Sequence, residues 1–144
     1  MLRIFDKIFS VLPFIILFFH LIKTFYNRDI LYILPHIIYT YTVSFLFKVL
    51  FKKNRRSKTY EFKEWKIPKL FKQLKVHYGF PSSHTMFFLK YYLLNPNLIN
   101  FVILTLGCFS RVYYQHHTKR EIVYTILFVL ILDWIILNVI DFIF

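Results

Sequence analysis

The chain has 144 residues, of which 58% are hydrophobic and 22% aromatic, and it carries a formal net charge of +12. This length suits a single domain over residues 1–144 and excludes a second domain of ordinary size. The apolar residues form long blocks with charges crowded between them, which is typical of membrane proteins.

The apolar blocks predict five helical membrane spans, each judged against the roughly 20 residues that cross a hydrocarbon core. We place them at residues 8–25, 30–51, 83–94, 98–114 and 122–144. No small-residue cleavage site follows the first block, so we interpret it as a retained span and not as a signal peptide. The third block is short and contains Lys90, which must snorkel or face a polar interior. The predicted fold is an all-α, polytopic membrane bundle of about five transmembrane helices with a basic interfacial loop.

That basic loop separates the second and third spans. Ten of the nineteen Lys and Arg residues fall between Lys52 and Lys75. Apolar residues recur at helical spacing among these lysines, which favours a helix in the membrane interface, and a solvated basic loop fits equally well. Such a cluster is attracted to the phosphates of lipid headgroups, so the net charge does not require a nucleic-acid partner.

Alternating spans bring three polar clusters to one side of the bundle: the end of the second span, the start of the third and the end of the fourth. These clusters are "KVLFKKNRR" from Lys48, "PSSH" from Pro81 and "SRVYYQHHTKRE" from Ser110. The groups that would converge are the cations Lys48, Arg55 and Arg111, the hydroxyls of Ser82 and Ser83, the imidazoles of His84 and His117, and the carboxylate of Glu121.

This set of groups suits phosphate chemistry. Cations and the free N–H groups at a helix start match the charge and the oxygens of a phosphate. One imidazole can attack phosphorus while the other protonates the departing oxygen. Glu121 follows His117 by four residues, so both share a face if a helix begins there, and the carboxylate could fix the tautomer of the ring.

Polar residues outside these clusters have structural interpretations. We interpret His116 as structural, and we expect Asp133, in the last apolar block, to face a partner or a cavity. The single cysteine, Cys108, has no disulfide partner and indicates no compartment.

The third cluster resembles a motif of the phosphatidic acid phosphatase type 2 superfamily, SRxxxxxHxxxD. Ser110, Arg111, His117 and Glu121 keep every spacing, with Glu in the place of Asp, and the spacing selects His117 over His116.

The superfamily's other two motifs, PSGH and KxxxxxxRP, occur in the expected order. The former is present as residues 81–84 with Ser for Gly, and the latter as Lys48 and Arg55, with Arg56 in the place of Pro. Within the superfamily, "YGFPSSHT" and "SRVYYQHHT" are most similar to dolichyldiphosphatases.

The resemblance implies a role for each matching residue. His117 would be the nucleophile that forms a phosphohistidine, and His84 the acid that protonates the leaving group. The phosphate cradle would consist of Lys48, Arg55, Ser82, Ser83 and Arg111. The cations would stabilise charge on the phosphate oxygens, so no metal or other cofactor is expected.

Three functions remain open. The first is hydrolysis of dolichyl, or another polyisoprenyl, diphosphate to the monophosphate. The second is a sphingoid-base or other lipid phosphate phosphatase, whose members carry a related "YGFPSTH". The third is a non-catalytic lipid-binding membrane protein, which the replaced Pro and Asp favour.

The side of the membrane on which the site lies is predicted differently by two arguments. Most Lys and Arg residues fall on the side of the motifs, which the positive-inside rule assigns to the cytoplasm. The resemblance implies a multi-pass protein of the endoplasmic reticulum with a lumenal site. We follow the resemblance, because a site for anions needs cations for its own reasons.

Overall fold

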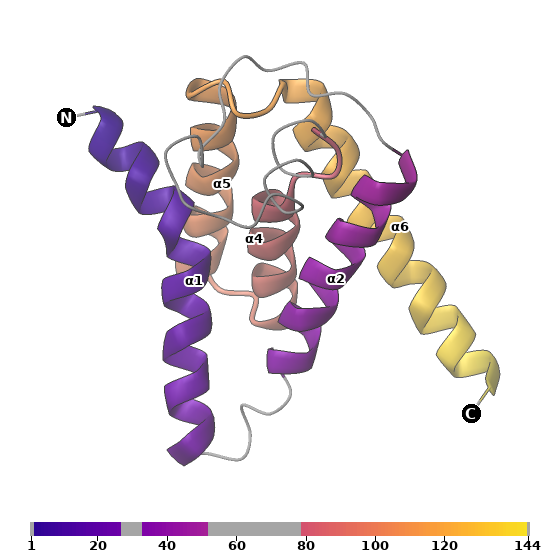
Figure 1. The fold of residues 1–144 in the computed structure, drawn as a ribbon. Helices are drawn as coiled ribbons and strands as arrows, with labels where there is room; N and C mark the ends of the chain where they lie inside the picture. Colours follow the sequence, from indigo (N-terminus) through magenta and orange to yellow (C-terminus); the bar gives the residue numbers. More distant parts are fainter. Residues whose placement is uncertain (1, 27–32, 52–78, 144) are drawn as a thin grey trace.

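The computed structural model describes residues 2–26, 33–51 and 79–143. These residues form the helices α1 (Leu2–Tyr26), α2 (Ile33–Phe51), α4 (Ser83–Leu94), α5 (Leu98–Tyr113) and α6 (Lys119–Ile143) (Figure 1). The all-α prediction is confirmed, and each predicted span corresponds to one helix. The predicted basic loop, with Arg55 and Arg56, lies outside the described residues.

The membrane part of the prediction has a different outcome. Across the described ranges, none of the helices combines the length and the apolarity that a membrane crossing requires.

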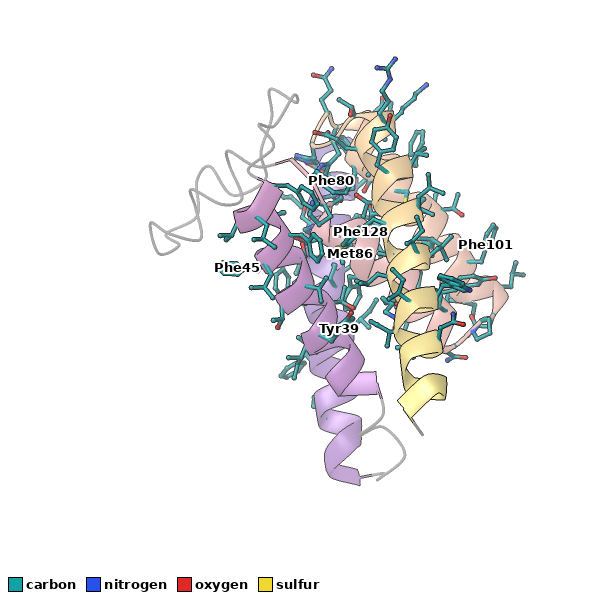
Figure 2. All side chains as sticks on the ribbon, turned by 90° about the vertical axis from the view of Figure 1, so that its right-hand side faces the viewer. Tyr39, Phe45, Phe80, Met86, Phe101 and Phe128 are labelled. Atoms are coloured by element: carbon teal, nitrogen blue, oxygen red, sulfur yellow. The ribbon has the colours of Figure 1, made fainter. Side chains whose placement is uncertain are left out.

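Helix α4 is the centre of the bundle, and α1, α2, α5 and α6 all pack against it. Six consecutive residues of α4 are buried: His84, Thr85, Met86, Phe87, Phe88 and Leu89. Phe87 and Phe88 pack against Phe9 of α1, and Met86 and Leu89 pack against residues of α2 and α6. Figure 2 shows Met86 between those two helices. A helix that is covered on every side belongs to a core, so the shortest predicted span organises the fold.

The contact between α4 and α5 depends on a glycine. A Cβ atom at Gly107 would lie 2.4 Å from Cδ2 of Phe88, whose side chain is fully buried. We expect Gly107→Ala to destabilise the fold by about 1–3 kcal/mol, because the ring has no room to move. Thermal unfolding in detergent measures this, with Thr105→Ala on the exposed part of α5 as the control. Adding Phe88→Leu to the Gly107 variant should restore part of the loss, and a Gly107→Ala protein as stable as wild type would contradict this packing.

Two charged residues of the apolar blocks pair with each other. Lys90 Nζ of α4 donates to Asp133 Oδ1 of α6 at 2.6 Å, and the side chains are only 12% and 19% exposed. Of the two alternatives expected for each residue, Lys90 faces a polar group inside the bundle and does not snorkel, and Asp133 faces a partner and not a cavity. Removing one member would leave a partly buried charge without this partner, so the pair favours the observed packing of α6 against α4.

The helices run in directions that bring the motif segments to one side of the bundle. The end of α2, the start of α4, the end of α5 and the start of α6 lie toward the same side of the bundle, uppermost in Figure 1. The start of α1 lies on that side as well. The sequence predicted this meeting for the three motif segments but did not include α1.

Candidate active site

The first and second motifs meet between α2 and α4. Lys48 Nζ, in the last turn of α2, donates to Ser83 Oγ at 3.1 Å, and Ser83 Oγ lies 2.7 Å from Ser44 Oγ. Lys48 is buried, whereas Ser83 is partly exposed at the first position of α4. A cation and a hydroxyl from two distant segments are therefore placed side by side.

The second and third motifs meet through Thr125 of α6. The backbone N–H of Ser82 donates to Thr125 Oγ1 at 3.0 Å, and the Thr125 hydroxyl donates to the Glu121 carbonyl at 2.7 Å. Ser82 caps α4, and its Oγ accepts bonds from the N–H and the hydroxyl of Thr85. The Ser82 side chain is fully buried in this cap, so its first role is to fix the start of α4.

His84 and Arg111 both contact Ser10 of α1. His84 Nε2 lies 3.1 Å from the Ser10 carbonyl oxygen, and Arg111 Nη2 donates to Ser10 Oγ at 3.3 Å. A carbonyl can only accept, so Nε2 of His84 carries a proton. A second proton on this ring would then reside on Nδ1.

A tight turn between α5 and α6 carries His117. Gln115 adopts a left-handed conformation with φ of 58°, and the N–H of His117 donates back to the Arg111 carbonyl at 2.9 Å. The left-handed residue reverses the chain after α5. His117 and Arg111 are thus held together by the backbone.

Glu121 belongs to a capping box at the start of α6. The N–H of Thr118 donates to Glu121 Oε2 at 2.7 Å, and the N–H of Glu121 donates to Thr118 Oγ1 at 3.2 Å. The same Oε2 lies 3.7 Å from His117 Nδ1, which is an ion-pair distance and too long for a hydrogen bond. Within the described part of the chain, Glu121 Oε1 has no hydrogen-bond partner.

Glu121 is ionised at neutral pH. Burial is the strongest influence and would raise the pKa of Glu121, but His117 and the N–H and hydroxyl of Thr118 together lower it from 4.5 to about 2. The stability that this ionised group contributes is present above about pH 4.5 and is lost as the pH falls toward 2.

The predicted site residues are almost all buried. Lys48, Ser82, His84, Arg111, His117 and Glu121 are each less than 8% exposed, and Ser83 is more open. Arg55 lies outside the described residues.

Four further polar residues join this network: Asp6, Ser10, Ser44 and Thr125. The sequence could have indicated two of them, because residues four apart share a helix face: Ser44 precedes Lys48 by four residues, and Thr125 follows Glu121 by four. Asp6 and Ser10 share a face of α1 by the same spacing, but no motif residue lies nearby in the sequence. His116, interpreted as structural, binds Asp6, and this is the contact that the sequence could not identify.

Neither metal ligation nor similarity to known proteins defines this site further. In the ranges that the structure describes, His, Cys, Asp and Glu side chains nowhere gather in groups of three that could hold a metal ion. Comparisons with models of protein families, with curated proteins and with solved structures found no match. The resemblance therefore rests on the three motifs and on where their residues lie.

Proposed function

We propose that this chain is a metal-independent lipid phosphatase that hydrolyses dolichyl, or another polyisoprenyl, diphosphate to the monophosphate and phosphate. The observation that supports it most is that hydrogen bonds connect residues of motifs far apart in the sequence. Lys48 contacts Ser83, and Ser82 reaches Glu121 through Thr125. The spacing of the motif residues along the sequence could arise by chance. That residues from different motifs also contact one another in the structure gives the match a physical basis.

In the proposed reaction His117 attacks the terminal phosphorus. A nitrogen–phosphorus bond forms as the bond from phosphorus to the bridging oxygen breaks, and His84 gives that oxygen its proton. Water then attacks phosphorus, the nitrogen–phosphorus bond to His117 breaks, and His84 takes up the proton that the water loses, so phosphate is released and both histidines return to their starting state. Since Nδ1 of His117 faces Glu121, Nε2 is the attacking nitrogen, and the carboxylate stabilises the cationic ring.

The cations bind the phosphate in this scheme. Lys48 and Arg111, with the Ser83 hydroxyl and the N–H groups at the start of α4, would stabilise charge on the phosphate oxygens. Arg55 joins them by the resemblance alone. A second phosphate on the substrate would add contacts for these cations, which favours a diphosphate over a monophosphate.

The proposal places the bundle in the endoplasmic reticulum membrane as a multi-pass protein with a lumenal site. Its support is the exposed apolar surface, because large hydrophobic side chains are exposed on every helix, including Phe18 (61%), Leu50 (72%), Leu98 (77%) and Trp134 (67%). An apolar surface of this kind is typical of contact with lipid or with a partner. Since no described helix meets the requirements of a span, this part of the proposal stands on the surface and the resemblance.

One observation favours a second candidate, a non-catalytic lipid-binding protein. Glu121, which replaces the superfamily's Asp, uses Oε2 in a helix cap and lies 3.7 Å from His117. A carboxylate with a structural role need not serve a nucleophile. A sphingoid-base or other lipid phosphate phosphatase remains the alternative within the same chemistry.

A direct comparison of substrates tests the proposal. Purified protein in detergent with a metal chelator is offered dolichyl diphosphate, sphingosine phosphate and phosphatidic acid side by side. We expect the fastest phosphate release from dolichyl diphosphate. Equal or faster release from sphingosine phosphate would move the protein to the alternative phosphatase, and binding without release would favour the lipid-binding candidate.

Substitutions of Glu121 separate its two roles. We expect Glu121→Ala to lose on the order of 100-fold in turnover, as groups that orient a reacting residue do, and Glu121→Gln to retain more. Loss of the capping box should also lower stability by about 0.5–2 kcal/mol. Turnover and thermal unfolding of the same preparations measure both. Unchanged turnover with lowered stability would leave Glu121 only its role as a cap.

A further inference from the structure

A carboxylate from the start of α1 joins two parts of the third motif. Asp6 Oδ1 accepts a hydrogen bond from Arg111 Nη2 at 3.3 Å and lies 2.8 Å from His116 Nε2, which must donate to it. The Asp6 side chain is 24% exposed, whereas those of Arg111 and His116 are 0% and 6% exposed. These contacts join segments more than 100 residues apart in the sequence, so they come from tertiary structure alone.

Arg111 depends on this carboxylate for its orientation. A fully buried guanidinium is costly unless an anion faces it. Its neighbours include Ser110 Oγ, 3.1 Å from Nε, and Ser10 Oγ, 3.3 Å from Nη2. Both are neutral, whereas Asp6 brings a carboxylate within 3.3 Å of Nη2. A planar guanidinium held by three oxygens has little rotational freedom.

The same carboxylate restrains the turn that carries His117. His116 directly precedes His117, and the N–H of His117 is bound to the carbonyl of Arg111. Asp6 therefore holds this turn on both sides, at the end of α5 and one residue before the proposed nucleophile. A displacement of about 1 Å at a reacting group can cost roughly 100-fold in rate, so this restraint matters for catalysis.

We infer that Asp6 is a positioning residue, which orients Arg111 and, through His116, the His117 ring; the inference rests on the function proposed above. Phosphate binding does not explain why Asp6 lies beside the site, since a carboxylate there repels a negatively charged substrate. Losing Asp6 removes this repulsion and also loosens Arg111, and these two effects oppose each other in substrate binding. The rate of the chemical step depends on the orientation of Arg111 and His117. Losing Asp6 therefore lowers this rate, and no opposing effect raises it.

The test compares Asp6→Ala and Asp6→Asn with Lys7→Ala, a change at the next residue of α1, which is exposed. Asn keeps an acceptor oxygen and the shape but not the charge, so it serves if Ala impairs folding. We expect kcat to fall about 100-fold for Ala and about 10-fold for Asn, with KM within about threefold of wild type. Wild-type kcat in either folded variant, or an equal fall in Lys7→Ala, would overturn the inference.

Two measurements separate this inference from a general loss of stability and from the proposed function. Adding His116→Ala to Asp6→Asn should cost less than the product of the single losses, because Asp6 acts partly through His116; fully multiplicative losses would contradict this. Nuclear magnetic resonance of ¹⁵N-labelled histidine rings needs no turnover. Asp6→Asn should shift the His116 and His117 resonances while Lys7→Ala leaves them unchanged, even if wild type hydrolyses no lipid and the proposed function fails. An unshifted His117 resonance would overturn the positioning role.

Discussion

Replacing His117 with alanine is expected to abolish phosphate release while the bundle still folds. His117 is the proposed nucleophile, and no other imidazole in the third motif has the superfamily's spacing. Loss of a nucleophile removes the covalent route, so turnover should fall by several orders of magnitude. Phosphate release from dolichyl diphosphate measures the loss, and thermal unfolding in detergent verifies the fold.

The neighbouring histidine is the matched control. His116 is buried and precedes His117, but its ring binds Asp6, so His116→Ala should lose only about 10- to 100-fold. Similar losses of turnover in His116→Ala and His117→Ala would contradict the assignment of His117, and not His116, as the nucleophile. Full activity of His117→Ala would show that the nucleophile lies elsewhere.

Replacing His84 with alanine is expected to lower turnover of dolichyl diphosphate by about 100- to 10,000-fold, the range for loss of a general acid. Nε2 of His84 faces the Ser10 carbonyl, so Nδ1 would deliver the proton to the departing oxygen. If the leaving group of a substrate departs without needing a proton, His84 should not be required for its hydrolysis. The same variant should therefore lose much less activity toward an aryl phosphate such as nitrophenyl phosphate.

The contrast between these two substrates distinguishes acid catalysis from simple damage to the site. Wild type and His84→Ala are compared on both substrates, with unfolding temperatures measured for each protein. An equal loss on both would show that His84 serves binding or packing. The latter is a real alternative, because the ring is buried against Phe88 and Ser10.

The helices could be predicted because apolar blocks in this chain are long and charges separate them. The third block was the hardest to interpret, since α4 is short and a helix buried on all sides has no polar face. Its place in the centre depends on four neighbours that no local pattern reveals. Lys90 was predicted to snorkel or to face a polar interior, and Asp133 to face a partner or a cavity; in the structure each is the partner of the other.

The candidate site was less predictable than the fold. The alternation of the predicted helices indicated which segments would meet, and Lys48 indeed contacts Ser83. The contribution of α1 was missed because Asp6 and Arg111 are 105 positions apart, and only packing of the whole bundle joins them. Glu121 was predicted to orient His117, but the sequence Thr-x-x-Glu also fits a capping box, and that role is the one with short hydrogen bonds.

Detection of a phosphohistidine shows directly whether His117 is the nucleophile. Purified protein is mixed with dolichyl diphosphate, quenched in alkaline denaturant during turnover, digested and examined by mass spectrometry. We expect a phosphate adduct on His117 that is absent from His117→Ala. Phosphate release without any adduct on His117, or an adduct on another residue such as Ser83, would contradict this expectation.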